Sequence, residues 1–210
     1  ALVGYLFLLF GQTRPGSRVG TAVSALLLTT VILHATYEGI LGATLGHHPM
    51  ATIFQIFSVM ALALASVYLW IEYREKNRNT GSFVLSFVAG LQLFAALGVD
   101  PVESIHPLLK TIPFGMHTGS ITLAFASFFL SMIYALMLLL FYRSMRRKQF
   151  GLLFEKLPPL SSLARMNLGA ALAGFIFMTL GIAFGLHWAV EKIDAFWRDP
   201  KIYFTFAIWL

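Results

Sequence analysis

The chain has 210 residues, of which 58% are hydrophobic and 11% charged, and its mean hydropathy is +0.78. Soluble domains carry about 25% charged residues, so this composition indicates a protein that is embedded in a lipid bilayer. The net charge of +6 is typical of basic loops in a membrane protein rather than of nucleic-acid binding, and the absence of cysteine excludes disulfides, Cys-ligated metal clusters and thiolate catalysis.

Apolar runs alternate with short polar connections along the whole chain. The first run, 1–10, is too short to span a bilayer and is interpreted as the remnant of a helix that lacks upstream residues. The last run begins near residue 202 and is interpreted as an unfinished spanning helix. Complete runs are expected at 19–42, 51–72, 82–99, 116–142 and 168–190. We therefore predict an all-α polytopic transmembrane helix bundle that forms a single domain over 1–210, with six to seven membrane segments here and eight in the full-length protein.

Helix-breaking and basic residues mark the connections. Pro101, Pro107 and Pro113 are expected to prevent a continuous helix in the segment that contains them. The connection RSMRRKQFGLLFEKLPPLSSLAR is predicted to be a long basic loop.

The basic residues are concentrated in alternate connections, which hold 11 of the 15 Lys and Arg. The positive-inside rule places these connections in the cytoplasm. The loop around residue 47, the proline-rich loop and the loop at 191–201 then face the outside. We expect the bacterial cytoplasmic membrane, with an organellar membrane as the alternative.

All six histidines fall on the half of the bundle that is expected to be outermost. A neutral imidazole can ligate heme iron or relay protons, and it can also be an ordinary interfacial residue. His47, His48 and His106 lie in predicted loops and are interpreted as interfacial residues. His187 lies near the end of the run at 168–190.

His34 lies inside an apolar run, four residues before Glu38 and on the same helix face. Ionisable groups within a membrane are costly and usually face the protein interior, so we expect both side chains to face the bundle. Three roles remain open for His34: a hydrogen-bonded pair that fixes helix packing, a ligand of buried heme, or a proton relay.

His117 begins a helix at the predicted outer face, and small residues follow it at 118–120 and 122. Small residues allow a neighbouring helix or a flat ligand to approach closely. The spacing leaves both a metal ligand and an interfacial residue open.

Aromatic residues flank or lie in the last predicted outer loop: Trp188, Phe196, Trp197, Tyr203 and Trp209. Such aromatic residues form belts at many membrane interfaces. They also suit a flat macrocycle, whose carboxylates Arg198 and Lys201 could pair with.

Three segments resemble the cytochrome c assembly family of heme-handling membrane proteins, which includes CcsA, ResC, the HemX-like proteins and, more distantly, CcmC. HTGSITLAFASFFLSMIYALMLLLFYRSMRRKQF is similar to the family's helix that opens with an external histidine. EKLPPLSSLARMNLGAALAGFIFMTLGIAFGLHWA resembles the loop and helix that lead into its tryptophan-rich heme-binding segment, and FWRDPKIYFTFAIWL resembles the end of that segment. The likeness covers most of the chain.

The resemblance implies that heme b is held between two external histidines. His117 matches the first, the second would lie beyond residue 210, and His34 could correspond to a transmembrane heme ligand. The remaining implied cofactor-binding residues are Trp188, Trp197, Arg198, Asp199 and Lys201. Arg198 stands where the family pattern has a tryptophan.

The function implied is a membrane protein of cytochrome c biogenesis that presents heme at the outer face for attachment to apocytochrome c. Its partners would be membrane lipid, apocytochrome c and other assembly proteins, and any catalysis would belong to a cytochrome c synthase, or heme lyase, system. One alternative is a non-catalytic subunit or regulator of a larger membrane complex, with a degenerate heme site. Another is a b-type cytochrome subunit of a quinone oxidoreductase, in which His34 pairs with His117 or His187. No sequence motif indicates a soluble-type enzyme.

Overall fold

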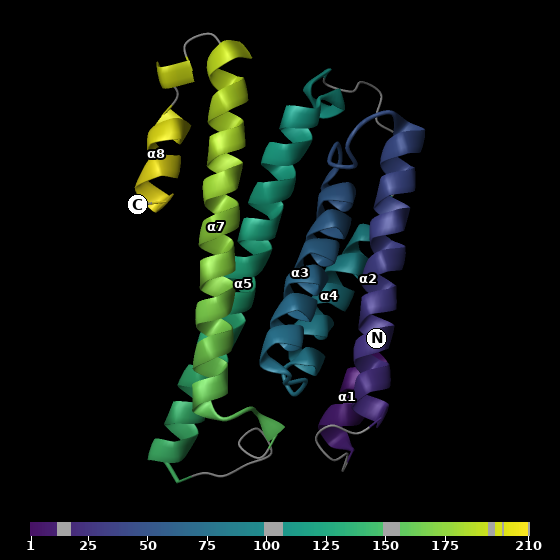
Figure 1. Cartoon of the computed structure of the whole chain (residues 1–210), viewed down its shortest axis with the longest axis vertical. Coiled ribbons are helices and arrows are strands. Elements are labelled where there is room, and N and C mark those ends of the chain that lie inside the picture. The colour runs from purple at the N-terminus through teal and green to yellow at the C-terminus, as the bar shows by residue number, and fades with distance from the viewer. Residues whose placement is uncertain (12–17, 99–106, 149–155, 193–195, 199, 210) are drawn as a thin grey trace.

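Each apolar run of the sequence forms a helix, because a backbone in lipid must satisfy its own hydrogen bonds. The computed structural model describes residues 1–11, 18–98, 107–148, 156–192, 196–198 and 200–209, where helices joined by short connections occur and no strand does (Figure 1). The elements in chain order are α1 (Leu2–Phe10), α2 (Arg18–Leu45), α3 (Ile53–Glu75), α4 (Gly81–Ala95), η1 (Pro107–Lys110), α5 (Ile112–Arg146), α7 (Leu160–Lys192), η2 (Phe196–Arg198) and α8 (Pro200–Trp209). The prediction of an all-α polytopic bundle is confirmed.

Four of these helices, α2, α3, α5 and α7, are long and apolar enough to cross a membrane. Helix α4 was expected at 82–99 but has only 15 residues. It is followed by Gly98, which the ring of Phe54 on α3 approaches so closely that a side chain there would overlap it. Helices α1 and α8 have 9 and 10 residues, fewer than the roughly 20 that a span requires.

Helices α5 and α7 begin earlier than the apolar runs expected at 116–142 and 168–190. Helix α5 begins at Ile112, so that Pro113 lies in its first turn, where a helix needs no backbone N–H donor. The described part of the proline-rich segment is thus not one continuous helix, as expected, because Thr111 separates η1 from α5 and Pro113 lies in the first turn of the new helix. Helix α7 begins at Leu160, directly after Pro158 and Pro159. The long loop had been predicted to continue through Arg165, so its last six residues, 160–165, are helical instead.

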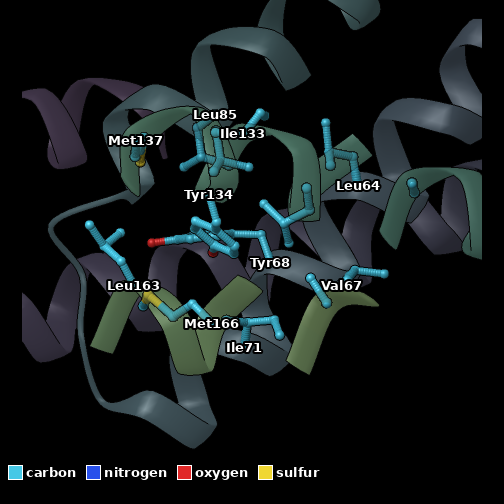
Figure 2. Packing of buried hydrophobic residues seen from close by; sticks show 14 of the residues in the cluster. Leu64, Val67, Tyr68, Ile71, Leu85, Ile133, Tyr134, Met137, Leu163 and Met166 are labelled. Atoms are coloured by element: carbon cyan, nitrogen blue, oxygen red, sulfur yellow. The ribbon is translucent and has the colours of Figure 1, made fainter. Parts of the chain in front are cut away.

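Helices α5 and α7 pack side by side along most of their length, and α3 packs against α2, α4 and α5 (Figure 1). Tyr68 and Tyr134 lie at the centre of the core, surrounded by aliphatic side chains from α3, α4, α5 and α7 (Figure 2). Both tyrosines are fully buried. This core occupies the half of the bundle in which α3 and α5 end and α7 begins.

The antiparallel arrangement gives the bundle two chemically different ends. The end that we call the basic end carries Arg74, Arg143, Arg146, Lys148 and Arg165. The opposite end, which we call the histidine end, carries His47, His48, Lys110, His117 and His187. The exposed Arg165 bonds through Nε to Oε2 of Glu75 at 3.0 Å, which ties α7 to α3 at the basic end.

The orientation of these ends in the membrane stays a prediction, which cysteine labelling tests. Cysteines introduced at Ser144, near the end of α5, and at Ala195, outside the described residues, should react with an impermeant maleimide from opposite sides. In intact cells only the variant at Ala195 should label, and the variant at Ser144 should label after permeabilisation. The chain has no native cysteine, so the background is low. Labelling of both variants from one side would contradict the predicted topology.

Candidate functional site

His117 lies near the beginning of α5 and faces α7. Its Nδ1 lies 2.7 Å from the carbonyl oxygen of Gly181. A carbonyl can only accept, so Nδ1 carries the proton and Nε2 keeps its lone pair. An imidazole whose Nδ1–H is held by a backbone carbonyl is the usual arrangement of a metal-ligating histidine. Among the described residues Nε2 has no recorded partner, so the ring is held in the form that binds iron.

Two glycines of the facing helix make room for this imidazole. The ring of His117 lies against Gly185 so closely that a Cβ there would overlap Nδ1, and Gly181 is similarly close to Ile121. The room was instead expected to come from the small residues at 118–120 and 122 of α5 itself. Thr118 and Thr122 use their hydroxyls on carbonyls of their own helix. The small-xxx-small spacing of Gly181 and Gly185 was the signal that could have identified them.

The final aromatic segment folds back along α7 (Figure 1). The Trp209 indole N–H donates to Oγ1 of Thr179 at 3.0 Å, and its ring stacks on Phe175 with centroids 5.8 Å apart. Trp197 is 55% exposed, and its carbonyl accepts a 2.7 Å hydrogen bond from the Tyr203 hydroxyl. The segment is thus attached to α7, the helix whose Gly181 carbonyl accepts the hydrogen bond from His117.

The predicted cofactor-binding residues of this segment lie only partly within the described residues. Arg198 is exposed in η2. Asp199 lies outside the described residues, as do the side chains of Trp188, in α7, and Lys201, in α8. A pocket formed by these residues and His117 therefore stays a prediction.

His34 and Glu38 face the interior of the bundle, as predicted. The His34 Nε2 lies 3.3 Å from Oε1 of Glu38 and 3.1 Å from Oγ of Ser58 on α3. Ser58 donates to Oε1 of Glu38 at 2.5 Å, so His34 Nε2 acts as the donor to the serine. This is the geometry of a pair that joins α2 to α3, and within the described part of the chain no contact links His34 to His117.

The other histidines of this end have different environments. His47 is buried, and its Nδ1 donates to the carbonyl of His48 at 2.7 Å. His48 bonds through its ring to the carbonyl of Thr111 and through its backbone N–H to that of Leu109, at 3.1 and 2.9 Å. These two residues fasten the loop between α2 and α3 to the start of α5, so they are structural rather than merely interfacial. His187 is exposed, and His106 lies outside the described residues.

A buried carboxylate at the opposite, basic end was missed by sequence analysis. Glu72 on α3 is 4% exposed and accepts hydrogen bonds from Tyr5, Ser24 and Tyr68 at 2.5, 2.5 and 2.8 Å. Arg78 donates to Ser24 at 2.6 Å and lies 3.7 Å from Glu72. Both carboxylate oxygens are thus satisfied, which is the pattern of a structural network. Its signal was an ionisable residue within an apolar run.

No group of three or more metal-ligating side chains occurs within the described ranges. Heme needs only one or two axial ligands from the protein, so this does not bear on a single histidine such as His117.

A family model described as "Cytochrome C assembly protein" matches residues 21–210. The relative named "Cytochrome c biogenesis protein CcsA" of Heterosigma akashiwo is 23% identical over 198 residues, which cover 77% of this chain and 62% of the relative. The proteins of the same name from Pyropia yezoensis and Parasynechococcus marenigrum are each 24% identical, over 100% and 95% of this chain and 77% and 72% of the relatives. The chain thus spans 62% of the length of the first of these curated relatives, which is less than two thirds, and 77% and 72% of the other two. No solved structure matches it significantly.

Proposed function

Because this chain belongs to the cytochrome c assembly protein family, we propose that it handles heme b in the membrane and presents it for attachment to apocytochrome c. The family supports a role in cytochrome c assembly, and the apolar helices agree with a multi-pass membrane protein. We place the presentation at the outer face of a bacterial cytoplasmic membrane, on the basis of the basic loops at the opposite end.

The observation that carries the proposal is the state of His117. Its Nδ1–H is bound to the carbonyl of Gly181, and Nε2 is free to act as an axial ligand. By the resemblance to the family, a second external histidine would complete the axial pair. When bound, heme supplies the two vinyl groups to which the cysteine thiols of apocytochrome c add. This chain has no cysteine, so in this proposal the thiols belong to apocytochrome c and the residues of this chain orient the heme.

The aromatic segment would form the remainder of the site. In this proposal Trp188, Trp197 and Asp199 shape the pocket beside the heme. The exposed Arg198, or Lys201, pairs with the heme propionates, because a guanidinium matches a carboxylate in geometry and charge. The attachment of α8 to α7 through Trp209 and Thr179 supports this arrangement, since α7 also supplies the Gly181 carbonyl that accepts the hydrogen bond from His117.

For His34, ligation of a second, transmembrane heme through Nε2 requires that its contacts with Ser58 and Glu38 first be broken. The present geometry supports the packing role instead. Absorption spectra of bound heme distinguish the two roles. If His34 only joins α2 to α3, its substitution leaves the axial ligation of heme, and hence the spectrum, unchanged.

Arg198, at a position where the family pattern has tryptophan, favours one second candidate function: a non-catalytic subunit or regulator that kept the fold. Deletion of the gene separates the two. Loss of holocytochrome c supports heme presentation, whereas normal maturation together with a stable complex between this protein and another membrane enzyme supports the subunit.

The direct test is an absorption spectrum of the purified full-length protein in detergent. We expect a Soret band on isolation, or its appearance with one equivalent of hemin, and red-shifted α and β bands of a six-coordinate heme after reduction. Bovine serum albumin, which takes up hemin without bis-histidine ligation, serves as the comparison. A protein without a Soret band that also takes up no hemin would contradict heme handling.

A further inference from the structure

One face of α5 carries exposed apolar side chains that lead into three exposed arginines at the basic end. The apolar members of this face are Phe125, Met132, Leu136, Leu139 and Leu140. The arginines are Arg143, Arg146 and Arg147. At 3.6 residues per turn all these positions fall within roughly a third of the helix circumference. The buried residues of α5, among them Leu130, Tyr134 and Phe141, lie on the opposite side, so this face does not contribute to the core.

The three arginines of α5 differ from the other arginines of the basic end in having no partner. Arg78 and Arg165 bond to side chains elsewhere in the bundle. The guanidinium of Arg74 lies 5.3 Å from the centroid of the Trp70 ring. The three α5 side chains have no hydrogen bond or ion pair among the described residues. Helix α5 itself contains no acidic residue. The charge of these guanidiniums is therefore available to a partner outside the chain.

The length of α5 places this charge at the membrane surface. Its 35 residues extend over roughly 52 Å, whereas the hydrocarbon core of a bilayer is about 30 Å thick. The last turn of the helix, which holds Arg143 and Arg146, therefore reaches the headgroup layer. Met132 precedes Arg143 by 11 residues, which is roughly 16 Å along the axis and close to the thickness of one hydrocarbon leaflet. One acyl chain can thus lie along the apolar part of the face while its headgroup meets the arginines.

The chemistry of the arginines restricts the headgroup. A guanidinium donates two parallel hydrogen bonds to a phosphate, which every phospholipid has. In a zwitterionic lipid the ammonium group of the headgroup balances the phosphate and is repelled by the neighbouring arginines. Three guanidiniums that no carboxylate of α5 balances therefore favour a headgroup with a net negative charge.

We propose that this face of α5 is a docking site for an anionic phospholipid. The headgroup phosphate lies between Arg143, Arg146 and Arg147, and one acyl chain lies along Met132, Leu136 and Leu140. The positive-inside rule requires only that cations gather at this end. The proposal adds a specific lipid contact, which does not depend on the proposal that the protein handles heme.

Local fluorescence quenching tests the proposal. The purified chain with Leu139→Cys carries a bimane label on its single cysteine, since no native cysteine is present. It is reconstituted in phosphatidylcholine vesicles with small amounts of phosphatidylglycerol or phosphatidylcholine that carry a nitroxide on an acyl chain. We expect the phosphatidylglycerol to quench at about fivefold lower mole fraction or less, because one arginine near the membrane surface contributes about that factor. A label at the exposed Tyr73 of α3, at the same end, reports the general surface attraction and should show a smaller preference.

Three combined variants complete the test. The first replaces the three α5 arginines by glutamine and should lose the preference at position 139. The second replaces them by lysine, which keeps the charge but cannot form paired hydrogen bonds, and should keep only part of the preference. The third removes three cations of the same end that lie outside this face and should keep the preference in full; its changes are Arg18→Gln, Arg74→Gln and Lys76→Gln. All of these side chains lie outside the core, and circular dichroism verifies that each variant keeps its helices.

The proposal would be overturned by equal quenching by the two lipids, by an unchanged preference in the glutamine or the lysine variant, or by an equal loss in the third variant. Competition with excess glycerol 3-phosphate, a headgroup without acyl chains, should leave the preference in place. Its disappearance would show that a soluble phosphate suffices and would overturn the docking of a lipid. No heme is measured, so each of these outcomes leaves the heme proposal unaffected.

Discussion

His117→Ala is expected to lower bound heme more than a substitution of any other histidine at the same end of the bundle. Removal of the imidazole removes the one ring nitrogen that is held in the metal-binding form by Gly181. A six-coordinate heme should become five-coordinate, with a corresponding change in the Soret and α bands. Added imidazole should restore the six-coordinate spectrum, because it occupies the space that the side chain left.

Two further variants distinguish ligation from a structural role. His187→Ala removes an exposed histidine from the neighbouring helix and should leave the spectrum unchanged. Gly185→Leu keeps His117 but pushes on its ring, since even a Cβ at that position would overlap Nδ1, so heme content should fall; imidazole should not restore it, because this change vacates no space. Wild-type heme content and an unchanged spectrum in His117→Ala would refute the assignment of His117 and favour the non-catalytic subunit.

Glu72→Leu is expected to give the largest loss of stability of any single substitution at the basic end. Leucine fills the volume but leaves the hydroxyls of Tyr5 and Tyr68 without their acceptor and Arg78 without its nearby carboxylate. Removal of one partner from a buried charged network costs about 3 kcal/mol or more. The helices α1, α2 and α3 and the α3–α4 connection meet at this carboxylate, so their packing should loosen together.

The measurement is the midpoint of thermal unfolding in detergent. Unfolding is monitored by the fluorescence of a dye that detects exposed apolar surface. Glu75→Leu is the matched control, three residues further along α3: it removes a carboxylate that pairs with the exposed Arg165, and such surface pairs contribute about 0–1 kcal/mol. Tyr5→Phe should lie between the two, with a loss of about 1 kcal/mol for one hydrogen bond. Equal midpoints for Glu72→Leu and Glu75→Leu would show that the buried network does not stabilise the bundle.

The amino-acid sequence by itself determined the class of the fold, the order of the helices and the division of the bundle into a basic and a histidine end. Hydrophobic runs suffice for this, because a segment in lipid has no partner for its backbone except itself and so forms a helix. The sequence also determined that His34 and Glu38 share a face, since residues four apart in a helix lie above one another. The boundaries of α5 and α7 were less accurate, because Pro113 and Arg165 are compatible with the first turns of a helix as well as with a loop.

Only the tertiary structure decided which side chains from different helices meet. The pairing of His117 with Gly181, of Glu38 with Ser58 and of Glu72 with Tyr5 and Ser24 joins residues 20 to 67 positions apart. In a soluble protein the apolar stripe of a helix would have indicated the faces that meet. In a membrane the lipid-facing side is as apolar as the buried side, so hydrophobic periodicity does not distinguish them, and close packing and polar contacts between helices select the partners.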